Sequence, residues 1–482
     1  MKRNSDLLIR TTFWLSIVAV ACVGVFFILN NAYWLVADDA IVIRHTGWGI
    51  PFKCADGTIP LIGRFFPFAY LPYNICLLFC DGLVSPKAHY LINAFGFLVF
   101  VGSLSVLALR MVNNTNTLYK YFIAICFVAV AVEITYPMFI LVRSTMWVDY
   151  TLVALFVLLC HCFYKSQKWI YGLCALLCIN YFCYCLESNF LFPLTMGGGA
   201  LIIGRMGKKN ISKRDFLFSW LLICSGLLYL VLYCILVLPY VTDAYDSSHG
   251  ASMGVLGNAF KMICECKMLV LILIVFFVRL IDTVKNKTEY TFFDVLLIMA
   301  VSCCCGGFAL RFNLNNYYIL YVLIGLPAVL YYSQLYLKGK MAIVLWPILF
   351  LLFIRPVGSQ VKHNQRDRKE TWKQVNLLSN KINEAKGVFC YEPIKEEYSY
   401  DVEIRTCKYN SICTYLGWLR HDMNYSITRV PSFAPVDNTV WLNALENEVL
   451  FPEDKELELY GERFYWAGWV DGYWVTTERK QP

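Results

Sequence analysis

Two adjacent carboxylates follow the first apolar run of this chain. The stretch "YWLVADDAIVIRHTG" spans residues 33–47 and places Asp38 and Asp39 shortly before Arg44 and His45. An ionised carboxylate can remove the proton of an attacking hydroxyl, and a second acid can orient the acceptor. The alternative role is helix capping, because an aspartate at a helix start accepts from backbone N–H groups. The two roles are compatible, and we expect Arg44 and His45 to position the loop or the acceptor.

A third carboxylate, Glu187, interrupts the apolar stretch "CYCLESNFLFP". A charge here is either an ordinary loop charge or a group that faces a cavity between two spans. Because the turn is short and its flanks are apolar, we include Glu187 with Asp38 and Asp39 as a candidate catalytic residue.

Three isolated arginines are candidate phosphate ligands: Arg143 in "LVRSTMWVDY", Arg311 in "ALRFNLNNYY" and Arg64 in "LIGRFFPF". A guanidinium beside amide side chains suits a phosphate. Asn315 and Tyr317 follow Arg311 and are expected to position the acceptor or the loop. The alternatives are contact with lipid head groups for Arg143 and Arg311, and anchoring of the loop for Arg64.

The composition is typical of a polytopic membrane protein. Of 482 residues, 59% are hydrophobic and only 16% are charged, whereas soluble domains are about 25% charged. The basic start and long apolar core lack a small-residue cleavage site, which favours an uncleaved first span. Most cysteines lie in apolar runs and act as small hydrophobes. No CxxC pair has a matching second pair, so we expect no zinc or iron–sulfur site, while a Cys407–Cys413 disulfide stays open.

The apolar runs predict about eleven transmembrane helices, since a span needs about 20 apolar residues. They cover residues 12–35, 88–109, 121–136, 147–164, 169–185, 189–204, 216–239, 261–281, 292–310, 317–336 and 341–355. The segment Pro67–Leu83 is ambiguous because it contains two prolines. If it does not span, the loops on the N-terminal side hold fourteen lysines and arginines, against four in the opposite loops after the second span. The fourteen include Lys208, Lys209, Lys213, Arg214 and Arg279.

The positive-inside rule then predicts a cytoplasmic N-terminus and a re-entrant or interfacial course for Pro67–Leu83. The first loop, 36–87, and the tail, 356–482, are therefore expected to be external. The tail reads as a small soluble α/β domain, with helices at 366–387 and 410–423, a short strand at "VFCYE" and hairpin strands within 462–478. The predicted fold is an all-α transmembrane domain, 1–355, followed by this domain.

An acidic pair after the first span, many spans and a soluble external tail together resemble the GT-C superfamily of glycosyltransferases. These integral membrane enzymes use polyprenyl-phosphate sugars. The stretch "DDAIVIRHTGWGIP" is similar to their Asp-Asp or Asp-Glu stretch, and Asp38 and Asp39 carry that motif. Length and layout also resemble the phage-type serotype-converting glucosyltransferases that modify the lipopolysaccharide O-antigen of the bacterial cell envelope. Residue-level similarity is confined to about 36–50, and Glu187 and Arg311 match no family motif.

The resemblance implies inverting transfer of a hexose from a polyprenyl-phosphate donor to a glycan or lipid-linked acceptor. The setting would be the periplasmic face of a bacterial inner membrane. A divalent cation stays open as a cofactor, and no nucleic acid partner is expected. The alternatives are a transporter or flippase of lipid-linked glycans, which would more often show internal repeats, and a glycan polymerase or ligase of another fold. A non-catalytic assembly protein is a further alternative. The sequence does not identify the sugar or the acceptor.

Overall fold

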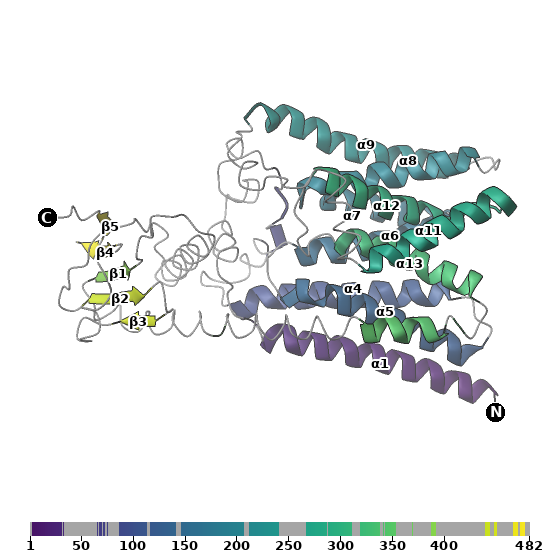
Figure 1. Cartoon of the computed structure of the whole chain (residues 1–482), viewed down its shortest axis with the longest axis horizontal. Coiled ribbons are helices and arrows are strands. Elements are labelled where there is room, and N and C mark those ends of the chain that lie inside the picture. The colour runs from purple at the N-terminus through teal and green to yellow at the C-terminus, as the bar shows by residue number, and fades with distance from the viewer. Residues whose placement is uncertain are drawn as a thin grey trace.

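The computed structural model describes the chain in segments (Figure 1). The described residues are 2–30, 32, 65, 67–69, 71–72, 75, 86–112, 116–140, 146–206, 212–240, 267–286, 288–310, 319–337, 341, 343–352, 369, 387–391, 439–443, 448–450, 466–470 and 473–477.

Within these residues, eleven α-helices occupy the eleven segments that the apolar runs predict, which confirms the helix positions. They are α1 (Lys2–Asn30), α4 (Pro86–Met111), α5 (Thr117–Ile140), α6 (Met146–Ser166), α7 (Trp169–Cys183), α8 (Leu191–Met206), α9 (Lys213–Leu236), α11 (Lys267–Asn286), α12 (Phe292–Leu310), α13 (Ile319–Tyr336) and the helix Ile343–Leu352. Two single-turn 3-10 helices, η1 (Glu187–Phe190) and η2 (Leu238–Tyr240), follow α7 and α9.

Five of the described helices are long and apolar enough to cross a membrane, so this is an integral membrane protein. They are Ser5–Asn30, Tyr90–Met111, Thr117–Tyr136, Trp147–Ser166 and Lys213–Leu236. Five further apolar helices are shorter, at 10–17 residues, and α11 carries Arg279 and Asp282 in its second half. Eleven membrane crossings therefore remain a prediction.

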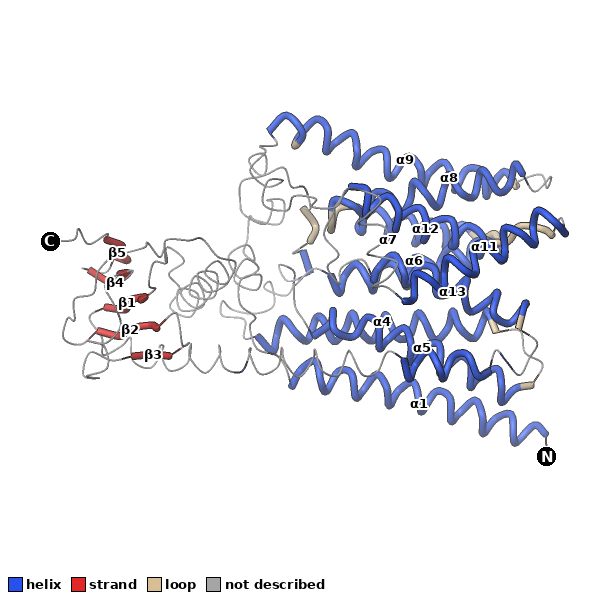
Figure 2. The backbone as a smooth tube through the Cα atoms, in the orientation of Figure 1, coloured by secondary structure: helices blue, strands red, loops and turns tan. Residues whose placement is uncertain are grey.

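Consecutive helices run back and forth along one bundle (Figures 1 and 2). The helix α1 packs against α4 and α5, α6 packs against α4 and α7, and α8 packs against α9 and α12. We call the end where α1 begins the proximal end, and the opposite end, where α1, α5, α7, α9 and α12 finish, the distal end. By the predicted orientation, the distal end would be external.

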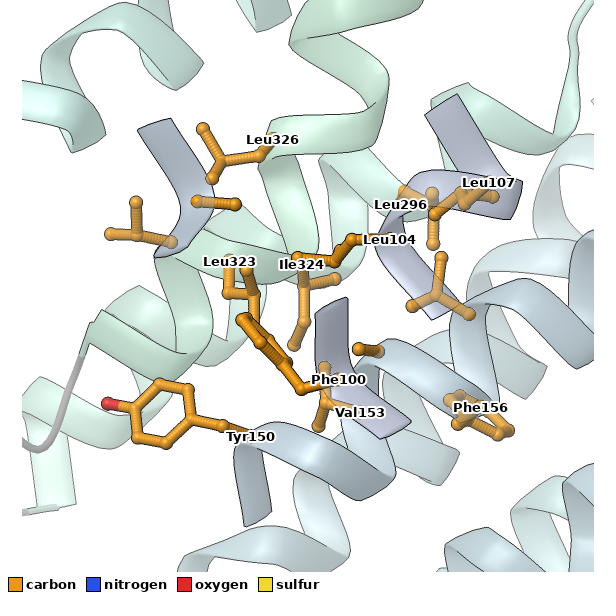
Figure 3. Close-up of a cluster of buried hydrophobic side chains, with 14 of the residues drawn as sticks. Phe100, Leu104, Leu107, Tyr150, Val153, Phe156, Leu296, Leu323, Ile324 and Leu326 are labelled. Atoms are coloured by element: carbon orange, nitrogen blue, oxygen red, sulfur yellow. The ribbon is translucent and has the colours of Figure 1, made fainter. Parts of the chain in front are cut away.

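The core of the bundle lies where α4, α6, α12 and α13 meet (Figure 3). Phe100, Leu104, Val153, Leu296 and Ile324 are all buried there. Outward-facing apolar side chains such as those of Phe95 and Leu177 are 67% and 72% exposed, as expected for surfaces that meet lipid.

Small residues bring α8 and α9 together. A Cβ at Gly197 would lie 2.4 Å from the carbonyl oxygen of Ser219, and a Cβ at Gly226 would lie 2.8 Å from that of Phe190. Without a hydrophobic force between helices in lipid, such close backbone approach is a main source of association. The start of α9 is fixed by Ser212, whose side chain accepts from the backbone N–H of Asp215 at 3.0 Å, a typical helix cap.

Beyond residue 386 the structure describes five strands. In one sheet, β1 (Gly387–Tyr391) pairs parallel with β2 (Thr439–Asn443), which pairs antiparallel with β3 (Glu448–Leu450). In the other, β4 (Trp466–Val470) and β5 (Tyr473–Thr477) form an antiparallel pair. The strands β1, β4 and β5 fall where "VFCYE" and the aromatic stretch 462–478 predict strands, whereas β2 and β3 lie in a stretch for which no strand was predicted. Most of the two helices predicted for this region lies outside the described residues, so the α/β domain stays a prediction.

Candidate functional site

Nine of the ten candidate site residues lie outside the described residues. They are Asp38, Asp39, Arg44, His45, Arg64, Arg143, Arg311, Asn315 and Tyr317. The tenth, Glu187, is the first residue of η1, and the structure describes its backbone only. Whether these side chains converge therefore stays a prediction. The described residues do define how the distal end of the bundle is built.

The later part of the predicted external loop is tied to the distal end by three hydrogen bonds. The hydroxyl of Tyr229, on α9, donates to the carbonyl oxygen of Phe65 at 2.6 Å. The hydroxyl of Tyr181, on α7, donates to the carbonyl oxygen of Phe68 at 3.0 Å. The backbone N–H of Phe68 donates to the carbonyl oxygen of Tyr184 at 3.1 Å. Three backbone groups of a short loop segment are thus satisfied by α9 and by the end of α7.

Ring contacts surround these hydrogen bonds. Phe68 stacks on Tyr181 with ring centroids 5.6 Å apart and an interplanar angle of 18°. Phe65 meets Tyr229 at 5.6 Å and Tyr184 at 6.1 Å. Aromatic pairs of this kind contribute about 0.5–1.5 kcal/mol each beyond the area that they bury. We call these five residues, Phe65, Phe68, Tyr181, Tyr184 and Tyr229, the aromatic clamp.

The clamp lies at the start of the segment Pro67–Leu83, for which the sequence predicts a re-entrant or interfacial course. The described residues of that segment form a turn at 67–69 and helical residues at 71, 72 and 75. Phe65 is 7% exposed and Ala69 is fully buried. The segment therefore begins as a buried turn between α7 and α9, and its further course remains a prediction.

A buried polar pair joins α6 to η1 beside the clamp. The Asn189 side-chain amide donates to Oδ1 of Asp149 at 2.9 Å and to the carbonyl oxygen of Phe182 at 2.8 Å. Asn189 is fully buried and Asp149 is 2% exposed. A buried carboxyl needs such a donor, because an unsatisfied one costs about 1–3 kcal/mol. This pair fixes η1, and with it the backbone of Glu187, to the distal end of α6.

A second buried acid, Glu133, lies in the later half of α5. Its side chain is 8% exposed, and neither carboxyl oxygen has a hydrogen-bond partner among the described residues. Acids inside membrane spans are costly and commonly mark functional sites. Glu133 and Asp149 also belong to the ionisable residues that the sequence places near the external membrane edge, although neither was a named candidate.

The arrangement suits binding and acid–base chemistry without a resident metal in the described part. Among the described residues, no three His, Cys, Asp or Glu side chains lie together as metal ligands. Buried carboxyls, a fixed turn and a clamped loop instead form a rigid platform.

At the proximal end, a second polar cluster joins α11 to α12. Arg279 donates from Nε to Asp294 at 2.8 Å and from Nη1 to Asp282 at 3.1 Å. Arg279 and Asp294 are each 5% exposed. The Asn286 amide and the Tyr336 hydroxyl donate to Asp282 and hold the pKa of its carboxyl below the ordinary value. Arg279 is therefore a buried, paired residue within α11, although the charge count grouped it with the loop cations.

Sequence reasoning missed Tyr181, Tyr229 and Asn189. Tyrosines in apolar runs are usual for membrane helices, so nothing in the sequence singles out these two. Asn189 carries a weak signal, since it lies two residues after Glu187 in an otherwise apolar stretch. Their roles become visible only when α7, η1 and α9 are brought together.

Comparisons of the chain with protein-family models, with curated proteins and with solved structures give no match. The family resemblance of the acidic stretch therefore remains a hypothesis, and the established statement is that this chain is a helical integral membrane protein with five described candidate spans.

Proposed function

We propose that this protein is a membrane glycosyltransferase of the GT-C type, which transfers a hexose from a polyprenyl-phosphate donor to an acceptor hydroxyl. The reaction would take place at the distal end, on the periplasmic side of a bacterial inner membrane. The observation that carries the proposal is the acidic pair Asp38–Asp39, which follows α1 within ten residues of its end at Asn30. The clamp supports it, because it attaches the same predicted loop to the distal end.

The chemistry requires one proton acceptor and one place for a phosphate. The acceptor oxygen attacks the anomeric carbon, a new C–O bond forms, and the bond from that carbon to the phosphate oxygen breaks. The hydroxyl proton passes to a carboxylate, for which we propose Asp38, with Asp39 orienting the acceptor. The polyprenyl phosphate leaves with the bonding electrons, and in-line attack inverts the configuration at the anomeric carbon.

The leaving phosphate needs cations, and the proposal assigns that task to Arg64, Arg143 and Arg311. Arg64 directly precedes clamp residue Phe65 in the chain. A loop held at Phe65 and Phe68 gives a neighbouring arginine less freedom, so it can bind a phosphate at a lower entropic cost. Glu187 would act beside Asp38 and Asp39, from a turn that the Asp149–Asn189 pair holds.

The test is a transfer assay with purified, reconstituted protein. We expect hexose transfer from a polyprenyl-phosphate hexose to a lipid-linked glycan, and none from the matching nucleotide sugar. A panel of hexoses on the same polyprenyl phosphate identifies the sugar. Transfer from the nucleotide sugar would contradict the proposal. So would a lack of transfer from every lipid-phosphate hexose in the panel.

A second function is favoured by one observation, the buried Glu133 in α5, whose carboxyl oxygens have no hydrogen-bond partner in the described part of the chain. Proton- or ion-coupled transporters of lipid-linked glycans place such acids inside their spans. The two functions separate in sealed vesicles. A transporter moves labelled lipid-linked glycan across the bilayer without changing it, and Glu133→Gln stops that movement. A transferase forms a new glycosidic bond instead.

A further inference from the structure

A cavity of about 520 Å³ opens at the proximal end of the bundle, between the ends of α4, α6 and α8 and the starts of α9 and α12. Its size lies within the usual range of ligand sites, about 300–1,000 Å³. The aromatic clamp lies at the opposite end, where the proposed function also places its reaction, so the proposed transferase chemistry does not account for this cavity.

Two cations line one part of the cavity. Arg110 ends α4 and donates from Nη1 to the Cys162 sulfur at 2.8 Å. Because that partner is a thiol, this contact does not itself neutralise the positive charge of the guanidinium. Lys165 lies in the last turn of α6. Both side chains are exposed, so they stand at the mouth of the cavity.

Two carboxylates line the same cavity. Asp215, in the first turn of α9, accepts a hydrogen bond from Gln167 at 2.9 Å through one of its two oxygens. Glu289 lies in the linker between α11 and α12 and is exposed. Among the described residues, the lining therefore includes two positive and two negative side chains. A ligand with charges of both signs matches this balance better than an anion or a cation alone, since like charges that meet cost affinity.

Deeper in the cavity the walls are mainly apolar, and two buried polar atoms, the Nε2 of His161 and the hydroxyl of Tyr164, have no hydrogen-bond partner among the described residues. Phe292, Phe293 and Ile203 line it. The His161 ring lies 5.7 Å and 5.9 Å from the rings of Phe292 and Phe293. Its Nε2 atom is buried and has no hydrogen-bond partner among the described residues. Buried polar atoms usually have a partner, from protein or from a bound molecule, and this one faces a cavity that can hold one.

We propose that this cavity binds the head group of a zwitterionic amphiphile, with a phosphate at Arg110 and Lys165 and an amine at Asp215 and Glu289. The Nε2 of His161 hydrogen-bonds to the head group, and the apolar wall takes the glycerol and the start of the tails. A membrane phospholipid such as phosphatidylethanolamine has this chemistry, and it reaches a site at a helix end from the bilayer.

The test compares three probes on the full chain in detergent, with bound probe counted by native mass spectrometry. They are phosphatidylethanolamine, phosphatidylglycerol with the same acyl chains, and soluble glycerophosphoethanolamine. We expect phosphatidylethanolamine to bind about tenfold more tightly than phosphatidylglycerol. Equal binding of the soluble probe would overturn the assignment to a lipid, because the apolar wall would then contribute nothing. Equal affinity for the two lipids would overturn the proposal.

Variants locate the binding. Arg110→Gln and Glu289→Gln change exposed side chains, so we expect each to fold and to lower the preference for phosphatidylethanolamine by about fivefold. Lys168→Gln is the matched control, because Lys168 is also exposed at the proximal end but does not line the cavity. His161→Phe keeps an aromatic ring and removes the polar atom, and we expect weaker binding of both lipids. A preference unchanged in Arg110→Gln and Glu289→Gln, or lost equally in Lys168→Gln, would refute the site.

Discussion

Removing single hydroxyls from the aromatic clamp should loosen the first external loop without disturbing the bundle. Tyr229→Phe and Tyr181→Phe keep both rings and delete the donors to the Phe65 and Phe68 carbonyl oxygens. Tyr184→Phe is the matched control. Tyr184 packs its ring on Phe65. Its backbone carbonyl oxygen accepts the hydrogen bond from the Phe68 N–H, and the substitution leaves that bond in place.

The magnitude follows from burial. Tyr229 is 1% exposed and Phe65 is 7% exposed, so Tyr229→Phe leaves a buried carbonyl without its donor, at about 1–3 kcal/mol. The Tyr181 hydroxyl belongs to a half-buried side chain, and its loss should cost about 0.5–1.5 kcal/mol. Because 1.4 kcal/mol is about a tenfold change in an equilibrium constant, local opening should increase about 5-fold to 140-fold in Tyr229→Phe.

Hydrogen exchange followed by mass spectrometry measures this opening. A peptide that covers residues 65–72 reports the Phe68 amide, whose hydrogen bond to Tyr184 protects it. We expect faster exchange in Tyr229→Phe and Tyr181→Phe, with exchange in α4 and α12 unchanged. Wild-type exchange in both variants, or an equal increase in Tyr184→Phe, would refute the reasoning.

Three further predictions follow from the same structure and sequence. Arg279→Met should lower the free energy of unfolding by about 3–5 kcal/mol, because it leaves the buried Asp294 carboxylate unpaired, and Arg279→Lys should lower it less; thermal unfolding in detergent measures both. Hydrogen bonds hold the pKa of the Asp282 carboxyl below its ordinary value. The ionised carboxylate therefore stabilises the folded protein above that ordinary pKa, and this contribution is lost as the pH falls through the lowered pKa. Asp282→Asn should remove this decline in stability at acid pH. Arg311→Ala and Arg143→Ala should weaken donor binding by about 2–5 kcal/mol and acceptor binding less, and unchanged donor affinity in both would leave Arg64 as the phosphate ligand.

The sequence predicted the helices well because long apolar runs need no tertiary information. Each of the eleven described helices lies on a predicted segment, although the ends differ, as in α1, which begins at Lys2 rather than residue 12. Arg279 shows where the reasoning failed. The charge count grouped it with the cytoplasmic loops although the predicted span 261–281 includes it, and the structure buries it in α11 paired with Asp294.

The clamp could not be predicted, for a physical reason. Its hydrogen bonds join residues that are 113 and 164 positions apart in the chain, and tyrosine is common enough in apolar runs to carry no signal. The candidate residues themselves were chosen by charge in apolar surroundings. That criterion also selects buried acids such as Asp149 and Glu133, but it does not reveal that Asn189 satisfies the first of them.

The most direct test of the central claim is the turnover of Asp38→Asn and Asp39→Asn in purified enzyme with a lipid-linked donor. Asparagine caps a helix about as well as aspartate, so a capping role alone predicts nearly normal transfer. If Asp38 is the base, Asp38→Asn should keep its expression level and donor affinity but lose about 100-fold or more in turnover. Asp56→Asn, which changes another acid of the same predicted loop, should transfer normally. Near-normal turnover of both Asp38→Asn and Asp39→Asn would contradict the account.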